Sequence, residues 1–263
     1  MSKSNSEILN YRVIGNGRPV IFLHGFLEDN SMWNDLTFSK DIQMICIELP
    51  GHGESRSAKE IESMFSMAES VYQVIQFLDL ESYCVVGHSM GGYVGLELMN
   101  VDASCEGLVL LNSNFWNDSA IKLEQRKRVA QVVQKNKSLF LYEAIPNLFF
   151  DPNSHDDSVK ILVQNAKKMS AKDISIISLA MGNRMDNSDV LKLNSEDVLV
   201  IQGQEDSTVK KSQMDLALQN IDVEYFVLQE VGHMAHIENP IETVRLIEKF
   251  IQKKRKLISF RYH

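Results

Sequence analysis

A serine flanked by glycines, where an apolar run meets a helical pattern, is the most restrictive feature of this chain. The segment reads Tyr83-Cys84-Val85-Val86-Gly87-His88-Ser89-Met90-Gly91-Gly92. A strand that turns directly into a helix here forces Ser89 into a strained backbone conformation, and a Cβ atom at Gly87 or Gly91 would collide with the turn. The hydroxyl then stands at a helix N-terminus, where backbone N–H groups favour negative charge. The segment predicts a nucleophilic Ser89; the alternative is a glycine-rich turn with an incidental serine.

Apolar runs and helical patterns alternate along much of the chain, which predicts an α/β fold with a mostly parallel central sheet and helices on both faces. Several runs are continuously apolar, as expected of strands buried on both faces. The strand candidates are Tyr11–Ile14, Val20–Leu23, Met44–Ile47, Tyr83–Val86, Leu108–Leu111, Val198–Ile201 and Glu224–Leu228. The helix candidates are Met64–Leu80, Met90–Val101, Thr208–Asn220 and Ile241–Lys253.

The alternation breaks once. More than eighty residues without a strong strand pattern separate the run ending at Leu111 from the run starting at Val198. Structureless loops of that length are rare in compact domains, so we expect a helical insertion at residues 114–189. Residues 1–113 and 190–263 would then form the core that carries it.

A serine hydroxyl needs a base to remove its proton. In folds built around such a turn the partners follow in the order Ser, then Asp or Glu, then His. His233 follows the last expected strand by a few residues and precedes a helix near Pro240, so it lies in a loop at the same sheet edge as Ser89. His236 is the competing candidate, but its place nearer the helix favours a packing or hydrogen-bonding role. We therefore expect His233 to be the base.

The acid is expected after the strand Val198–Ile201, where Gly203 is followed by two carboxylates, Glu205 and Asp206. Asp206 would accept a hydrogen bond from Nδ1 of His233 and hold the required tautomer. Glu205 is the alternative, and it points elsewhere if Asp206 points inward. Asn112 follows Leu111, so the end of that strand lacks a carboxylate.

Two backbone N–H groups are needed to hold the oxyanion of a tetrahedral intermediate. One is expected from Met90, directly after the nucleophile, and the other from Phe26 in the loop after Val20–Leu23. His24 is expected to order this loop by hydrogen bonding.

Composition limits the partners and the location. The 263 residues carry a formal net charge of -8, which argues against a nucleic-acid partner. No apolar stretch is long enough for a membrane span, and the start Met1–Glu7 is polar. Cys46 and Cys84 lie in apolar runs, where buried free thiols are expected. We expect a cytoplasmic protein, with a periplasmic form cut from a longer precursor as the alternative. The proposed chemistry needs no cofactor or metal, and His233 with His236 makes a weak metal pair.

These segments, with Pro50-Gly51-His52-Gly53-Glu54-Ser55 and with Gly232-His233 followed by Glu238 and Pro240, resemble the α/β-hydrolase fold superfamily. The resemblance is to its small serine esterases with a helical cap, and it covers about residues 20–251 apart from the insertion. It implies that the insertion is the cap over the active site and that Trp33 helps to line the pocket. Dehalogenases and epoxide hydrolases of this fold carry aspartate where this chain has Ser89.

The nucleophile, base, acid and oxyanion donors expected at one sheet edge predict a serine hydrolase that cleaves a small carboxylic ester, thioester or lactone through a Ser-His-Asp triad and an acyl-enzyme. Its substrate would be a small molecule. The alternatives are C–C bond hydrolysis, a lyase step or acyl transfer by the same triad, and a ligand-binding sensor with slow turnover.

Overall fold

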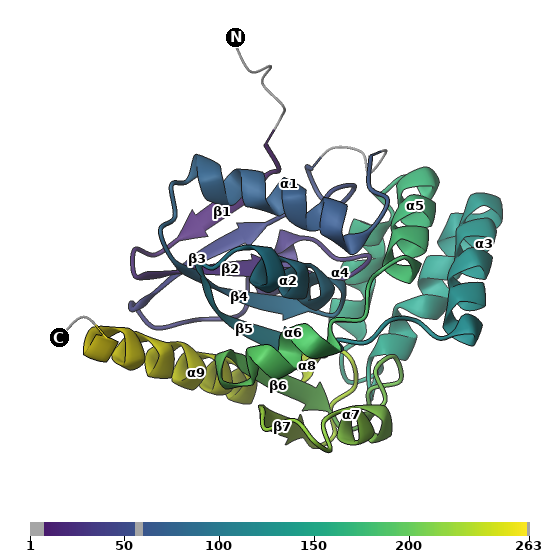
Figure 1. The fold of residues 1–263 in the computed structure, drawn as a ribbon. Helices are drawn as coiled ribbons and strands as arrows, with labels where there is room; N and C mark the ends of the chain where they lie inside the picture. Colours follow the sequence, from purple (N-terminus) through teal and green to yellow (C-terminus); the bar gives the residue numbers. More distant parts are fainter. Residues whose placement is uncertain (1–7, 56–59, 262–263) are drawn as a thin grey trace, which may run out of the picture.

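The computed structural model describes residues 8–55 and 60–261, so the start Met1–Glu7 lies outside the described residues. Within the described ranges the chain forms a seven-stranded sheet in the order β1-β3-β2-β4-β5-β6-β7 (Figure 1). Only β1 is antiparallel to its neighbour, and the other pairs are parallel. The strands are β1 (Tyr11–Ile14), β2 (Arg18–Leu23), β3 (Ile42–Ile47), β4 (Tyr83–His88), β5 (Cys105–Leu111), β6 (Val198–Gly203) and β7 (Glu224–Leu228). The predicted strands and the mostly parallel sheet are confirmed.

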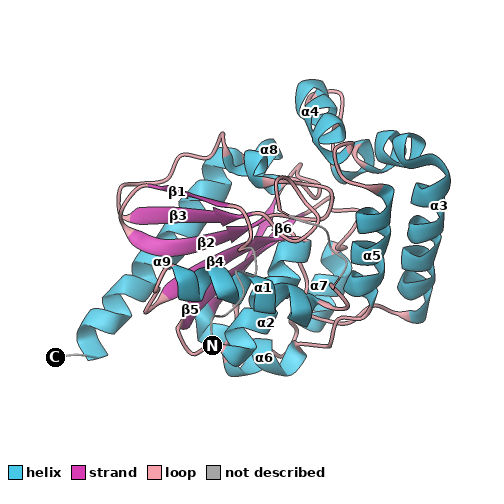
Figure 2. Ribbon diagram, turned by 90° about the horizontal axis from the view of Figure 1, so that it is seen from above, coloured by secondary structure: helices cyan, strands magenta, loops and turns pink. Residues whose placement is uncertain are grey.

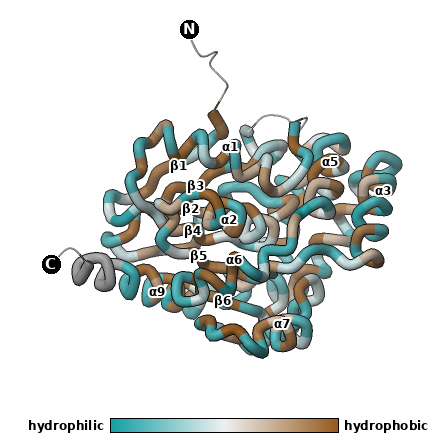
Figure 3. The backbone as a smooth tube through the Cα atoms, viewed as in Figure 1, coloured by the Kyte–Doolittle hydropathy of each residue, from teal (hydrophilic) through white to brown (hydrophobic). Residues whose placement is uncertain are grey.

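Helices cover both faces of the sheet (Figure 2). On β2, Ile21 and Leu23 belong to the apolar cluster shared with α1 (Met64–Phe77) and α2 (Met90–Val101). Val20 and Phe22 belong to the cluster on the other face, beneath α9 (Pro240–Arg261). Successive strand residues point to opposite faces, so a strand buried on both must be apolar throughout. Figure 3 shows this as hydrophobic segments along the central strands.

The segment between β5 and β6 is helical. It contains α3 (Ala120–Ala144), α4 (Asp156–Ala166), α5 (Ala171–Gly182) and α6 (Ser188–Leu193). Helices α3, α4 and α5 lie together beyond one end of the sheet in Figure 2, whereas α6 packs against α2. The amide of Asn187, which precedes α6, donates to Glu97 Oε1 of α2 at 3.1 Å.

The helix ends differ from their predicted positions for local reasons. Helix α7 spans only Lys211–Ala217, because the N–H groups of Thr208 and Val209 donate to Asp206 Oδ1 and form a turn instead of a first helical turn. Helix α1 ends at Phe77, before Asp79 adopts a positive φ of 52°.

Cys46, Cys84 and Cys105 are free and buried, which confirms the prediction for the first two. In the described part of the chain, no helix combines the length and the apolar character needed to cross a bilayer.

Candidate active site

Ser89 sits at the sharp turn between β4 and α2. Its φ is 50° and its ψ is -113°, a conformation that L-residues rarely adopt. A Cβ atom at Gly87 would lie 2.4 Å from the carbonyl oxygen of Gly91, and one at Gly91 would lie 2.2 Å from the carbonyl oxygen of Leu23. The Ser89 N–H donates to the Leu111 carbonyl at 2.9 Å, which anchors the turn to β5. The predicted strain at Ser89 and the need for both glycines are confirmed.

His233 lies between Ser89 and Asp206 and contacts both. Its Nε2 is 2.8 Å from Ser89 Oγ, and its Nδ1 is 2.8 Å from Asp206 Oδ2. Ser89 follows β4, Asp206 follows β6 and His233 follows β7, so the three side chains come from the carboxyl ends of parallel strands. With the Nδ1–H tautomer, His233 donates to the carboxylate and Nε2 accepts from the hydroxyl.

The Asp206 carboxylate is held in place by several donors. Its Oδ1 accepts from the N–H groups of Thr208 at 2.8 Å and Val209 at 2.9 Å. Its Oδ2 accepts from Asn112 Nδ2 at 3.0 Å in addition to His233. Burial by itself raises the pKa of Asp206, but His233 and these hydrogen bonds outweigh it and lower the pKa below its usual range. Asp206 therefore remains a carboxylate facing His233.

Asn112 is a residue whose contribution the sequence did not reveal. It directly follows β5, where a carboxylate would be the alternative acid, and has a positive φ of 47°. Besides Asp206, its amide donates to the Gly232 carbonyl at 2.9 Å. Asn112 thus connects the loop of Asp206 with the loop of His233. Its position after an apolar strand was the one available signal.

The two competing candidates lie elsewhere. Glu205 is exposed, and its Oε1 is 3.5 Å from Gln204 Nε2. The ring of His236 is buried, packs against His88 with ring centroids 4.9 Å apart, and has no hydrogen bond at either nitrogen. The structure therefore brings Asp206 and His233, rather than these two residues, into line with Ser89.

The loop after β2 lies directly against the nucleophile. A Cβ atom at Gly25 would stand only 3.2 Å from the Cβ of Ser89, so the loop that carries Phe26 is adjacent to Ser89. Met90, the first residue of α2, is fully buried. His24 orders this loop as predicted, because its Nδ1 lies 2.8 Å from the Gly25 carbonyl and its Nε2 accepts from the Leu49 N–H at 3.0 Å.

Comparison with protein families gives a match over most of the chain. The family described as alpha/beta hydrolase fold matches residues 18–240. The chain belongs to the α/β-hydrolase fold family.

Solved structures of similar shape include esterases and a lactonase. A thermophilic esterase from Thermogutta terrifontis is 26% identical with a TM-score of 0.85, over 94% of this chain and 93% of that one. The enol-lactonase from Burkholderia xenovorans LB400 has a TM-score of 0.82 at 20% identity, over 93% of this chain and 96% of that one. At that identity the likeness shows the fold alone.

One similar protein is named as an acetyltransferase component instead of an esterase or a lactonase. The dihydrolipoyllysine-residue acetyltransferase component of the acetoin cleaving system of Pseudomonas putida is 25% identical over 90% of this chain. This chain spans 64% of that relative's length, which is less than two thirds.

In this α/β-hydrolase, a buried network joins three parts of the site. Glu28 Oε2 accepts from the Gly25 N–H at 2.6 Å and from His88 Nδ1 at 2.7 Å. His88 Nε2 donates to the His233 carbonyl at 2.8 Å. The loop of Phe26, the strand end before Ser89 and the loop of His233 are thereby connected through Glu28 and His88.

Glu28 and His88 form a buried ion pair. Burial by itself raises the pKa of Glu28, but the charge and hydrogen bond of His88 lower it to about 2. Burial by itself lowers the pKa of His88, and Glu28 more than reverses this, so the pKa lies above its usual value. No local sequence pattern marks Glu28 as the partner of His88, which is 60 residues away.

The same residues form a cluster of metal-ligand types among the described residues. Ligand atoms of Glu28, His88 and His236 all lie within 4.8 Å of one another. The hydrogen bond between Glu28 Oε2 and His88 Nδ1 already uses one atom of each, whereas Glu28 Oε1 and both nitrogens of His236 have no hydrogen bond. The arrangement is that of a buried ion pair beside the imidazole of His236. Burial and the charge of His88 lower the pKa of His236 to about 3.

Trp33 occupies the apolar core rather than open space. It is 1% exposed and packs against Phe22, with ring centroids 5.3 Å apart, and against His236, with centroids 5.8 Å apart. The buried Trp33 side chain therefore offers almost no surface to a bound substrate.

The segment between β5 and β6 contacts the loop of His233 directly. The His233 N–H donates to the Leu148 carbonyl at 2.7 Å. Glu238 accepts from the Gly232 N–H at 2.9 Å through Oε2 and from the Phe150 N–H at 2.7 Å through Oε1. Glu238, which the sequence singled out as part of a motif, connects the two segments.

Proposed function

We propose that this protein is a serine hydrolase that cleaves a small carboxylic ester, thioester or lactone. The observation that carries the proposal is the His233 imidazole between Ser89 Oγ and Asp206 Oδ2, at 2.8 Å from each. These distances suit proton transfer from the hydroxyl and orientation of the ring by the carboxylate. The esterase among the structural relatives, at 26% identity, supports an ester as substrate.

In the proposed reaction Ser89 Oγ attacks the acyl carbon while His233 Nε2 takes the hydroxyl proton. The N–H groups of Phe26 and Met90 stabilise the oxyanion. His233 then gives its proton to the leaving oxygen or sulfur, and an acyl-enzyme remains. Water, deprotonated by His233, attacks that ester, so that the carboxylic acid leaves and Ser89 recovers its proton. Asp206 stabilises the imidazolium in both steps.

We also propose that residues 114–189 form a cap over this site. Two contacts support this proposal. The His233 N–H donates to the Leu148 carbonyl, and Gly232 approaches the backbone of Phe150 so closely that a Cβ atom at Gly232 would lie 2.6 Å from Phe150 N. A cap held against the loop of His233 limits the entry of water and substrate to Ser89.

Labelling with a fluorophosphonate probe tests the nucleophile. The protein should be labelled with one probe per chain and should hydrolyse 4-nitrophenyl esters of short acids. Ser89→Ala should abolish both, while Ser113→Ala, which removes a buried hydroxyl that donates to the Ser89 carbonyl at 2.6 Å, should retain labelling. Labelling of Ser89→Ala at unchanged stoichiometry would contradict the assignment.

The same experiment separates the alternatives. Full labelling with only trace hydrolysis of a broad ester and lactone panel would favour C–C hydrolysis, a lyase step or acyl transfer. The name of the Pseudomonas putida relative makes acyl transfer the first of these to assay. Ligand-dependent thermal stabilisation with turnover slower than minutes would instead favour a sensor.

A further inference from the structure

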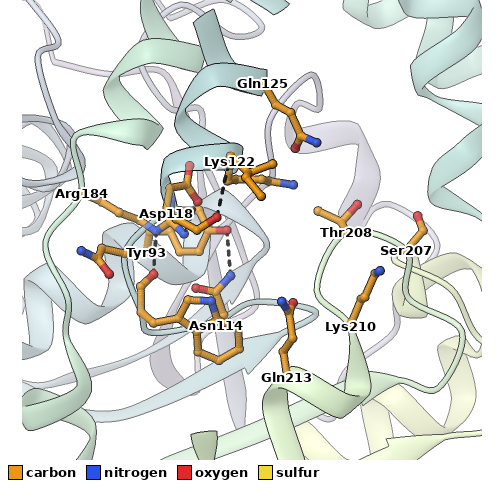
Figure 4. Close-up of a pocket in the computed structure, with 14 residues that line it drawn as sticks. Tyr93, Asn114, Asp118, Lys122, Gln125, Arg184, Ser207, Thr208, Lys210 and Gln213 are labelled. Atoms are coloured by element: carbon orange, nitrogen blue, oxygen red, sulfur yellow. Dashed lines mark hydrogen bonds and ion pairs between the residues drawn. The ribbon is translucent and has the colours of Figure 1, made fainter. Parts of the chain in front are cut away.

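A cavity of about 770 Å³ lies beside the loop that follows Asp206, and Figure 4 shows the residues that line it. Its walls come from α2, from the start of α3 and its preceding loop, and from the loop between β6 and α7. Ser207 and Thr208, which directly follow Asp206, form part of the wall, as does Asn114, two residues past Asn112. The cavity therefore adjoins the loops that position the proposed acid.

The lining is polar. The larger apolar side chains in it are Tyr93, Trp116 and Ile121, and all the other lining residues have charged, amide or hydroxyl side chains. Asn114 Oδ1 is buried there without a hydrogen-bond partner. A long acyl chain would gain little from these walls, because apolar ligands need apolar lining.

The one carboxylate of the lining is already neutralised. Asp118 pairs with Arg184 Nη2 at 2.7 Å and with Arg126 Nε at 3.0 Å, and its side chain is 3% exposed. Arg184 also donates to the carbonyls of Met181 at 2.8 Å and Trp116 at 3.1 Å. This cluster holds the wall together and leaves no negative charge unpaired.

Two ammonium groups in the lining have no partner. Lys122 projects from α3 and Lys210 from the segment before α7, on different walls in Figure 4. Neither ammonium group makes a hydrogen bond or an ion pair in the described part of the chain. Lys122 is half-buried, so its charge has lost part of its hydration without gaining an acceptor. Burial and Arg126 lower its pKa, while the charges of Asp118 and Asp206 act in the opposite direction.

The whole chain carries a net charge of -8, so the surplus of positive charge in this cavity is opposite in sign to the charge of the chain. We propose that this cavity binds an anionic group of the substrate, such as a free carboxylate, with Lys122 and Lys210 as its charge partners. The proposal rests on the proposed hydrolase activity and narrows its substrates to esters, thioesters or lactones that carry an acid group. The unpartnered Asn114 Oδ1 would accept from a hydroxyl or N–H of the same ligand.

Matched esters test this selectivity. The 4-nitrophenyl monoesters of succinic, glutaric and adipic acid carry the acid at graded distances, and 4-nitrophenyl butyrate is the neutral reference. In the wild type at least one acid ester should have the higher kcat/KM. Lys122→Gln should lower the ratio of acid to neutral kcat/KM by about tenfold, mainly through KM, as expected for one lost charge-assisted hydrogen bond. Lys122→Glu should lower the ratio further.

Lys127→Gln is the control on the same helix, since its ammonium lies 3.5 Å from Glu124 and its side chain is 62% exposed. It should leave the ratio unchanged. An equal ratio in the wild type and in Lys122→Gln for all three acid esters would overturn the proposal.

Binding of glutarate separates this proposal from the hydrolase assignment, because it needs no turnover. Calorimetry on Ser89→Ala should show glutarate binding that Lys122→Gln weakens by about tenfold, and Lys127→Gln should not affect it. Lysine-dependent glutarate binding without any ester hydrolysis would leave the anion site standing while the proposed function fails. Ester hydrolysis without lysine-dependent binding or selectivity would leave the hydrolase standing while the anion site fails.

Discussion

At the scale of single residues, two adjacent carboxylates have different surroundings. Asp206 is 4% exposed and contacts His233, whereas Glu205 is exposed and contacts Gln204. Asp206→Asn should lower kcat by about 10⁴-fold, because the amide favours the wrong imidazole tautomer. Glu205→Gln, a change of the same kind one residue away, should change kcat by no more than about twofold, as for other surface substitutions. Steady-state kinetics on one ester measures kcat for both variants. A larger loss of kcat in Glu205→Gln than in Asp206→Asn would make Glu205 the acid in place of Asp206.

At the scale of elements, the turn from β4 to α2 depends on close backbone contact with β2. Gly91→Ala would place a Cβ 2.2 Å from the Leu23 carbonyl oxygen, which is backbone and cannot move aside cheaply. We expect a loss of about 1–3 kcal/mol or more in the free energy of unfolding, with loss of esterase activity. Urea denaturation measures the change in the free energy of unfolding.

Gly182→Ala is the matched control, since its nearest neighbour is the end of the flexible Leu123 side chain at 3.1 Å. Alanine is favoured over glycine in helices by about 1 kcal/mol, so this variant should be neutral or slightly more stable. Equal destabilisation by both substitutions would show that the turn does not require its glycine.

At the scale of the whole molecule, the Glu28–His88 pair should shape the dependence of stability on pH. The pKa of Glu28 in the folded protein is about 2, below its ordinary 4.5, because His88 outweighs the effect of burial. The contribution of ionised Glu28 to the free energy of unfolding is therefore complete above pH 4.5 and is lost as the pH falls toward 2. The pKa of His88 lies above its ordinary 6.5. The contribution of protonated His88 to the free energy of unfolding is therefore complete below pH 6.5 and is lost at higher pH. The pair should stabilise the fold most between about pH 4.5 and 6.5.

Melting temperatures from pH 2 to 9 test this for the wild type and Glu28→Gln. The variant should melt at lower temperature near pH 5.5, and the difference should shrink toward pH 2 and again above pH 6.5. Glu242→Gln, which removes a partly exposed partner of the exposed Arg245, should alter the curve much less, because ion pairs at the surface contribute little. A constant difference between wild type and Glu28→Gln at every pH would contradict an ionised pair.

The sequence by itself determined the elements whose pattern is local. The apolar runs predicted the strands, since a strand buried on both faces needs apolar residues throughout. The turn at Ser89 was predictable because Gly87 and Gly91 are required within a few residues of it. The known order of the partners in folds with this turn, together with the positions after strand ends, then selected Asp206 and His233.

Only the tertiary structure decided what depends on residues far apart in the chain. The bond from His88 to the His233 carbonyl spans 145 residues, and that from Asn112 to Asp206 spans 94. Trp33 entered the core, and Lys122 became half-buried without an acceptor for its ammonium group, through packing that no periodicity encodes. A local pattern reflects the backbone of one element, whereas the partner of a buried polar group is set by how separate elements meet.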